Sequence, residues 1–363
     1  MHTINYSFLV EFSESGVCAT DGAGLVQAAG SGNTEEVSKL IRCPNVDINY
    51  VDSGNRTALL RASFSGHLLV VDVLLNDTRI KVNGAKAGTG ETPLFYASEQ
   101  NHTEIVRKLL SHPDIKVNLA LTNGETALYI ASKYGQVEIV KALLSQPKIN
   151  VNLGDNEGRT PLYGAAWYGH VDVVKQLLSR PRIKVNQGKT GMVTPLYIAS
   201  ENGHVDVVRE LLSQSQINVN VRTTDDGVTP LFVASVWGFV EVVKELLSHK
   251  QIDVNLAKIT TGSTPLSIAS EEGNVDVVKE LLADPRVDPN KLRTSYKDYA
   301  LSIAAWKGQL QVVKLLLRCP KVKLGIKDRL GKTALDYAKE GGFTDIEKAI
   351  ESRSTLLEMG HTC

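Results

Sequence analysis

The hydrophobic positions of this chain recur every 34 or 35 residues. Ten times a Leu is followed by an Ala three residues later and by a Gly or Asn four residues after that, beginning with Leu25, Ala28 and Gly32. We call the residue two positions before each Leu the anchor of its unit. The anchors stand at positions 23, 57, 92, 126, 160, 194, 229, 264, 299 and 333. A period of this length predicts a solenoid, in which stacked units share one continuous core.

Each unit begins with the pattern of a short helix. In the unit anchored at Thr160, the Thr is a favourable N-cap and Pro161 suits the first helical turn. Leu162 and Ala165 then lie on one apolar face, and Gly169 can supply the left-handed conformation that ends a helix. We therefore expect the first helix to end near Gly169.

A second helix is predicted from about Val171 to Ser179, where Val174 and Leu177 continue an apolar face of helical period. A loop then reaches Asn186, and a turn containing Gly leads to the next anchor. The variation between 34 and 35 residues falls in this turn, as expected of a projecting finger. Each unit is therefore two antiparallel helices and a finger, with hydrogen bonds inside the hairpin accounting for the constant Asn.

Five units carry Thr-Pro-Leu at the anchor, and two carry Gly-His-Val-Asp-Val-Val, at 169–174 and 203–208. In these motifs the chain resembles the ankyrin repeat over residues 23–351. The resemblance implies an all-α fold, a curved solenoid of stacked helix-turn-helix units with β-turn fingers. It also implies that the fingers and first helices line a concave face that binds other proteins.

Three features depart from the family pattern. The units exceed the usual length of 33 residues, and aromatic residues replace the His of the motif in five successive units. We expect these rings to stack and support the solenoid; they are Phe95, Tyr129, Tyr163, Tyr197 and Phe232. The unit anchored at Tyr299 has lost both the Thr and the finger Gly, which Lys297 replaces, so its finger geometry is in doubt.

The repeat pattern also divides the chain. Residues from Ile4 to Phe12 alternate between apolar and polar except at Leu9, which suits either an extended segment or a disordered tail. Charged residues up to Arg353 make the final helix polar enough to face water, as a capping repeat should. The expected organisation is an N-terminal extension at 1–22, a solenoid at 23–353 with an N-cap at 23–50, internal repeats at 51–325 and a C-cap at 326–353, and a tail at 354–363.

Charge and composition argue against several classes of partner. Forty basic and forty acidic side chains cancel without forming a long block of like charge, so nucleic acid is not an expected partner. No apolar run approaches the 18 residues of a membrane span, and the N-terminus does not resemble a secretory signal. Four cysteines suit a compartment where thiols stay free. A cytoplasmic monomer is expected, with the nucleus, or the host cytosol for an effector, as alternatives.

No constellation of residues indicates catalysis, a cofactor or a metal. Gly331-Lys332-Thr333 resembles the end of a phosphate-binding loop, but the glycine spacing is wrong and the triplet coincides with a finger and its anchor. Four histidines share one phase of the repeat, and residues of equal phase lie roughly 10 Å apart, too far to share a zinc ion. We expect loop hydrogen bonds instead from His67, His102, His170 and His204.

The candidate binding residues are aromatic and acidic. All three tryptophans and two tyrosines fall seven or eight residues after an anchor, at phases that face the groove in the family; the alternative is that these rings only cover neighbouring units. Surface Trp and Tyr concentrate binding energy. Acidic residues at these phases or on a finger suit a basic or amphipathic peptide, unless they are merely solvated. The candidates are Tyr134, Trp167, Tyr168, Trp237, Trp306, Glu201, Asp225, Asp226, Glu271 and Glu272.

The expected function is that of a non-catalytic scaffold or adaptor that binds a partner protein or peptide on the concave face. The alternative is a regulatory or target-recruiting arm, either a viral or bacterial effector or a fragment of a larger enzyme or channel. In some members of the family the Asn before the finger is hydroxylated. Asn118, Asn152 and Asn186 occupy that place here.

Overall fold

A computed structural model of the chain describes residues 21–359. It divides into two compact units, residues 1–123 and 124–363. The first contains α1 (Gly22–Ser31), α2 (Thr34–Ile41), α3 (Ala58–Ser65), α4 (Leu68–Leu75), α5 (Pro93–Glu99) and α6 (Thr103–Leu110). The second contains α7 (Ala127–Lys133), α8 (Val137–Leu144), α9 (Pro161–Trp167), α10 (Val171–Leu178), α11 (Pro195–Glu201), α12 (Val205–Leu212), α13 (Pro230–Trp237), α14 (Val240–Ser248), α15 (Pro265–Glu272), α16 (Val275–Ala283), α17 (Ala300–Trp306), α18 (Leu310–Arg318), α19 (Ala334–Glu340) and α20 (Thr344–Glu358).

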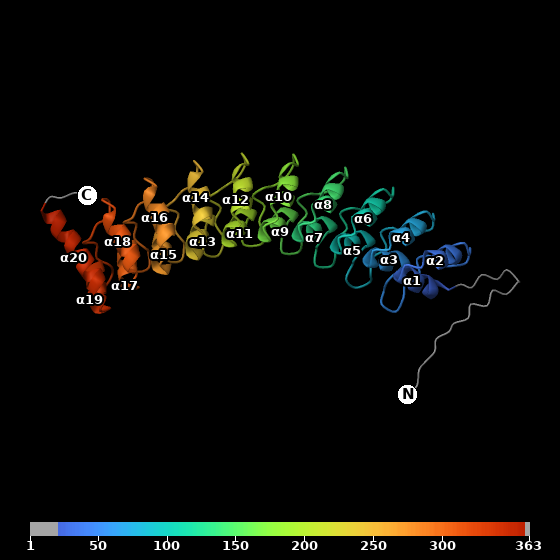
Figure 1. Cartoon of the computed structure of the whole chain (residues 1–363), viewed down its shortest axis with the longest axis horizontal. Helices are drawn as coiled ribbons and strands as arrows, with labels where there is room; N and C mark the ends of the chain where they lie inside the picture. Colours follow the sequence, from blue (N-terminus) through green and yellow to red (C-terminus); the bar gives the residue numbers. More distant parts are fainter. Residues whose placement is uncertain (1–20, 360–363) are drawn as a thin grey trace, which may run out of the picture. The chain divides into compact units, whose positions relative to one another are not determined.

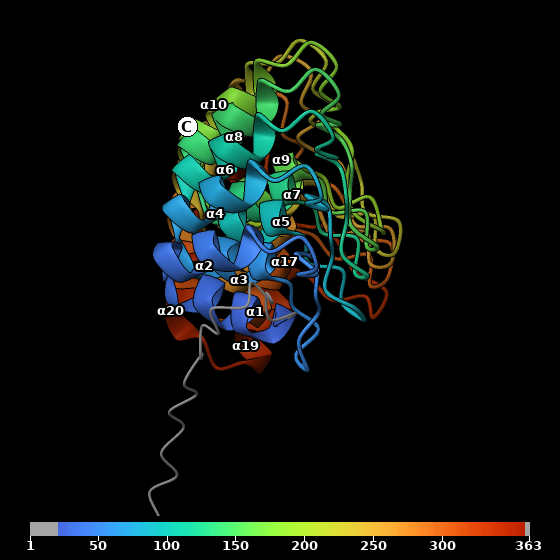
Figure 2. The ribbon, with the colours of Figure 1, turned by 90° about the vertical axis from the view of Figure 1, so that its right-hand side faces the viewer.

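Both units are stacks of helix pairs, as the sequence predicts (Figure 1). Within each unit, the first helices of successive pairs, which carry odd numbers, pack against one another in one layer, and the second helices form a second layer. The first helices lie between the second helices and the fingers (Figure 2). Among residues 21–359 the β-structure is limited to isolated bridge residues, at Ala120, at Thr126 and in the bridge between Lys189 and Val193. The fold is therefore an all-helical solenoid.

The helix boundaries follow from the capping residues. At α9 the Oγ1 of Thr160 accepts a hydrogen bond from the backbone N–H of Tyr163 at 3.2 Å, and Pro161 is the first helical residue. Gly169 adopts a φ of 76°, which an L-amino acid with a side chain adopts only at a cost. The predicted start and end of the first helix are thus confirmed in this repeat.

The core lies between the two helix layers. Leu162 and Ala165 of α9 and Val174 and Leu177 of α10 are each at most 1% exposed. The small alanine lets the two helices approach closely. Each pair covers the apolar face of the next, so the repeated Leu and Ala are packing residues.

The constant Asn connects neighbouring repeats rather than the two sides of its own hairpin. Nδ2 of Asn152 donates to the carbonyl oxygen of Arg182 at 2.8 Å, and Oδ1 accepts from the N–H of Lys184 at 2.8 Å. The expectation of bonding within the hairpin is therefore wrong. The same pair of bonds to the next repeat is made by Asn49, Asn83, Asn186, Asn220, Asn255 and Asn290.

The finger before Tyr299 keeps the geometry of the other fingers despite its unusual sequence. The N–H of Arg293 bonds to the carbonyl oxygen of Asp298 at 2.8 Å, and that of Lys297 bonds to Arg293 at 3.0 Å. Lys297 takes a φ of 60°, in the place where most other fingers have Gly. The backbone conformation is thus retained, with a lysine in the left-handed region.

Lys297→Gly is expected to raise the free energy of unfolding by about 0.5–1 kcal/mol, because glycine relieves the left-handed strain at some cost in unfolded-chain entropy. Urea unfolding followed by circular dichroism measures the change. The matched control is Gly262→Ala at the same finger position, where φ is 75° and a Cβ would stand 2.3 Å from the Thr294 nitrogen. That variant should lose stability. Equal stability of Lys297→Gly and the parent protein would contradict the assignment of strain.

Two features near the ends differ from expectation. Arg353 is 8% exposed, so it is buried in the final helix rather than facing water. The same helix, α20, continues to Glu358, five residues beyond the assigned boundary at 353. The alternating segment from Ile4 to Phe12 lies outside the described residues.

The thiols also differ from expectation. Cys43 forms a disulfide. The prediction that thiols stay free is therefore wrong for Cys43, whereas Cys319 is a free thiol. Within the described part of the chain, no helix is long and apolar enough to cross a bilayer.

Candidate functional site

Four of the five candidate aromatic side chains are exposed where the first helices end. Tyr134 and Tyr168 follow directly after α7 and α9 and are 51% and 49% exposed. Trp237 and Trp306 are the last residues of α13 and α17 and are 60% and 52% exposed. Trp167, the last residue of α9, is only partly exposed, because other rings pack against it.

Trp167 belongs to an aromatic cluster on its own repeat. The ring of Tyr163 meets it edge to face with centroids 5.6 Å apart, and Tyr168 stacks on it at 6.0 Å. Tyr168 in turn stacks on His170 at 6.3 Å. Part of the Trp167 surface therefore supports the fold, and only the remainder is available to a partner.

Two of the exposed rings are already covered by a lysine ammonium group of the protein itself. Nζ of Lys133 lies 5.6 Å from the ring centroid of Tyr134, and Nζ of Lys307 lies 4.6 Å from that of Trp306. A lysine over a ring face is held by the ring quadrupole. Tyr168 and Trp237 are the exposed aromatics best suited to a new contact.

Sequence reasoning missed one exposed aromatic residue of the same phase. Phe64 lies seven residues after the anchor Thr57, as Trp167 does after Thr160, and it is 48% exposed. Its ring meets Tyr96 edge to face at 5.2 Å. The phase of the repeat identifies Phe64 when Phe is counted together with Trp and Tyr as a binding residue.

The five rings that replace the motif His are mainly buried, which supports a structural role, but the ring contacts of residues 21–359 do not include the expected stacking of these rings on one another. Phe95, Tyr129, Tyr163 and Phe232 are between 1% and 5% exposed. Burial raises the pKa of Tyr129 to about 12, because the ionised phenolate would be poorly solvated there. Tyr197 is the exception, since it is only partly buried.

Several acidic candidates are already neutralised by the chain. Asp226 pairs with Nζ of Lys258 at 2.7 Å. Glu271 pairs with Arg293 at 3.0 Å and lies 3.6 Å from Nζ of Lys307. Not every predicted acidic residue is therefore available to a basic partner, whereas Asp225 and Glu272 contribute exposed carboxylates.

One pocket of about 320 Å³ collects four of the ten candidates, namely Trp167, Glu201, Asp225 and Asp226. It lies between α9, α11 and the finger that precedes α13. Its lining residues are Tyr163, Trp167, Lys189, Val193, Tyr197, Ile198, Glu201, Thr223, Asp225, Asp226 and Val228. Tyr134, Tyr168, Trp237, Trp306, Glu271 and Glu272 do not line it.

Glu201 is the half-buried carboxylate of this pocket. Burial raises its pKa, while a hydrogen bond donated by the Tyr197 hydroxyl and the charge of Lys189 oppose that shift. Burial likewise raises the pKa of Tyr197, and the nearby charge of Glu201 adds to the effect. Glu201 makes no ion pair within 4.0 Å among the residues of the described structure.

The four histidines of equal phase bond to the preceding repeat, which confirms their predicted loop hydrogen bonding. In each case Nε2 lies 2.9–3.1 Å from the carbonyl oxygen of a residue at the end of the previous first helix. For His204 that residue is Trp167, so the backbone of the aromatic cluster is fixed by the next repeat. Between residues 21 and 359 no three His, Cys, Asp or Glu side chains are grouped as metal ligands.

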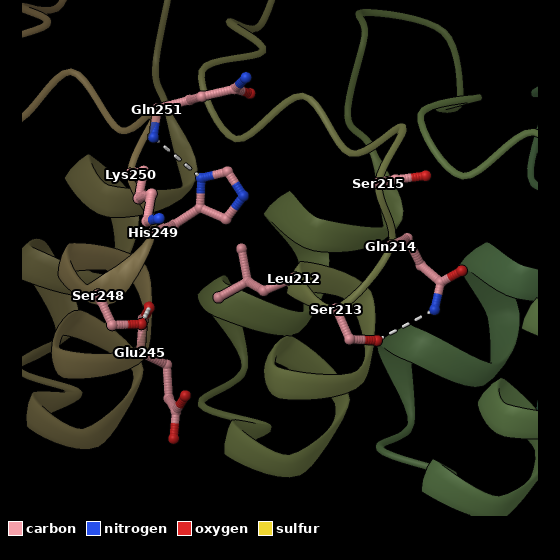
Figure 3. Close-up of a pocket in the computed structure, with 9 residues that line it drawn as sticks. All are labelled: Leu212, Ser213, Gln214, Ser215, Glu245, Ser248, His249, Lys250 and Gln251. Carbon is pink, nitrogen blue, oxygen red and sulfur yellow. Dashed lines mark hydrogen bonds between the residues drawn. The ribbon is translucent and has the colours of Figure 1, made fainter.

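A second pocket, of about 500 Å³, lies at the ends of α12 and α14 (Figure 3). Its polar groups largely satisfy one another or the local backbone. Nε2 of Gln214 bonds to Oγ of Ser213 at 3.1 Å, and the N–H of Gln251 bonds to Nδ1 of His249 at 3.3 Å. Ser248 bonds to the carbonyl oxygen of Glu245 at 2.6 Å. The arrangement offers no nucleophile paired with a base.

The stacked helix pairs, the capped helix starts and the fingers define a repeat protein of the ankyrin type. A family model described as ankyrin repeats (3 copies) matches residues 25–120, 112–189, 182–258 and 266–351. The chain therefore belongs to the ankyrin-repeat family. Among solved structures it is similar to the human ASB11 ankyrin repeat domain, with 28% sequence identity and a TM-score of 0.52. That match covers 63% of this chain and 98% of the ASB11 domain.

Proposed function

We propose that this chain is a non-catalytic scaffold or adaptor that binds a partner protein or peptide. The binding face is formed by the first helices and fingers of residues 124–363. Ankyrin repeats are in general modules of protein–protein interaction, and their fold is typically non-catalytic. We further propose that the chain acts as a monomer in the cytoplasm and that its partner is basic or amphipathic.

The observation that carries the proposal is the exposure of Tyr168, which stacks on the pocket-lining Trp167, and of Trp237 at the end of α13. Large aromatic side chains are costly to leave in water and bury much area with little loss of side-chain entropy on binding. Neither exposed ring has a fold-stabilising cation of the kind that covers Tyr134 and Trp306. A recruiting arm within a larger assembly would use the same face.

The double variant Tyr168→Ala with Trp237→Ala is expected to weaken partner capture at least about tenfold, as for buried aromatic hot spots. The midpoint of thermal unfolding should change little, because both rings are about half exposed. Quantitative affinity purification with mass spectrometry compares the variant with the parent protein. Trp167 is left intact because its ring packs on Tyr163.

The matched control is Leu69→Ala, which removes a large apolar side chain that is 68% exposed on α4, a second helix outside the proposed face. It should leave the partners captured by the parent protein unchanged. If the double variant captures the same partners equally well, the proposed face is wrong. If it unfolds several degrees lower with unchanged capture per folded molecule, the two rings serve the fold instead.

A further inference from the structure

The pocket beside Glu201 is equivalent to the surroundings of Glu271, two repeats further along the chain. There the carboxylate is neutralised by a side chain of the protein itself. Glu201 and Glu271 both lie seven residues after their anchors, Thr194 and Thr264. At Glu271 the guanidinium of Arg293, from the next finger, lies 3.0 Å from the carboxylate. At Glu201 the next finger provides no such cation.

The two fingers are equivalent, so the comparison is residue by residue. Thr223 and Arg293 each lie six residues before an anchor. The N–H of Thr223 bonds to the carbonyl oxygen of Val228 at 3.0 Å, and that of Arg293 bonds to Asp298 at 2.8 Å. Thr223 therefore occupies the backbone position of Arg293, with a side chain too short and without charge.

A second cation is replaced as well. Nζ of Lys307 lies 3.6 Å from Glu271, and Lys307 is the eighth residue after its anchor, Tyr299. The eighth residue after the corresponding anchor of the Glu201 site is Trp237. An aromatic ring thus stands at the repeat position of a lysine.

The remaining basic residues near the pocket are engaged elsewhere. Nζ of Lys189 lies 3.6 Å from Glu157, and Lys258 pairs with Asp226 at 2.7 Å. The charges of Glu201 and of the exposed Asp225 therefore give the pocket a net negative charge. Its walls include three aromatic side chains, Tyr163, Trp167 and Tyr197.

We propose that this pocket binds the guanidinium group of an arginine side chain in the partner, held by Glu201 and the aromatic walls. The inference rests on the proposed binding function and gives that face a chemical specificity. The bond between Arg293 and Glu271 provides the template for it. Arginine is favoured over lysine because its planar group stacks on rings and can bond a carboxylate with two N–H groups.

The probe is N-acetyl-arginine amide, titrated into the full chain labelled with 5-fluorotryptophan and observed by fluorine NMR. The resonance of Trp167, assigned with Trp167→Phe, should shift in a saturable manner. Trp306 belongs to a distant repeat and should not respond. The neutral analogue N-acetyl-citrulline amide should bind at least about tenfold more weakly, because it lacks the charge-assisted bond. Equal binding of citrulline, or an equal shift of Trp306, would overturn the proposal.

Glu201→Gln keeps the size of the side chain and removes its charge. It should weaken binding of the arginine probe at least about tenfold while the thermal midpoint stays equal or rises, since a half-buried charge is lost. The matched control, Glu272→Gln on the surface of α15, should bind the probe as the parent does. Unchanged binding by Glu201→Gln would reject the assigned role of Glu201.

A graft tests the comparison between the two repeats. Thr223→Arg combined with Val228→Asp copies the Arg293–Asp298 pair into the finger beside Glu201. The internal arginine should occupy the pocket and abolish the probe response. A graft variant that binds the probe like the parent would contradict the proposal. If the graft variant does not fold, the binding of the probe by Glu201→Gln tests the proposal instead.

Failure of this inference can be told apart from failure of the proposed function. The probe titration requires no partner, whereas the capture experiment with Tyr168→Ala and Trp237→Ala requires no occupied pocket. Lost capture without any probe response would reject the arginine pocket alone. A specific probe response with unchanged capture would reject the aromatic face and keep the pocket.

Discussion

Replacing Arg293 by Met is expected to lower the free energy of unfolding by about 3–5 kcal/mol, the usual cost of breaking a buried ion pair. Arg293 and Asp298 are 7% and 8% exposed, and two nitrogens of the guanidinium bond to the Asp298 carboxylate at 2.7 and 2.5 Å. A third bond, at 3.0 Å, reaches Glu271. The methionine would leave the buried Asp298 carboxylate without its cation, whereas Glu271 would keep only Lys307 at 3.6 Å. Urea unfolding followed by circular dichroism measures the loss.

The double variant Arg293→Thr with Asp298→Val provides the control. It copies the Thr223 and Val228 pair of the equivalent finger, so it removes the buried acid together with its cation. Most of the lost stability should return, because an apolar replacement for a buried pair is often neutral. A double variant as unstable as Arg293→Met would show that the arginine acts through packing and not through charge.

Replacing Tyr299 by Thr is expected to lower the free energy of unfolding by about 2–4 kcal/mol, although Thr is the anchor residue of eight other units. The side chain of Tyr299 is fully buried, and its hydroxyl donates to the carbonyl oxygen of Lys323 at 2.5 Å. The variant would leave a cavity of nearly a whole ring, and a new N-cap bond of about 1 kcal/mol would offset only part of that.

Tyr299→Phe separates the ring from its hydroxyl. It keeps the packing and leaves only the Lys323 carbonyl without its donor, so a loss of about 1–3 kcal/mol is expected. Thermal and urea unfolding of both variants provide the comparison. If Tyr299→Thr stabilised the protein, as substitutions toward a consensus commonly do, the ring would not be part of the core.

The local signals in the sequence were sufficient to predict the repeat and most of its helix boundaries. Thr160 caps α9 and Gly169 ends its repeat's first helix in the left-handed conformation, as their residue types require. His204 forms the expected hydrogen bond, to the carbonyl oxygen of Trp167 at the end of α9. These features depend on residues within one unit and its immediate neighbour, so the repeat phase alone locates them.

The candidate site could be predicted only in part. Repeat phase correctly marked Tyr168 and Trp237 as exposed. It could not distinguish the charge environments of Glu201 and Glu271, because both residues lie seven positions after an anchor. Packing makes them different, since Arg293 from the following finger neutralises Glu271 whereas Thr223 faces the Glu201 pocket.

The sequence by itself therefore determined the solenoid, the phase of every residue and the buried face of each helix, because these follow from periodicity and capping within short segments. Only the tertiary structure decided which charges are neutralised, how far Trp167 is covered, and that Asn152 joins two repeats. Those outcomes depend on which groups packing brings together, within one repeat at Trp167 and between neighbouring repeats at Glu271 and Asn152. The distances between these groups are set by packing and not by spacing along the chain.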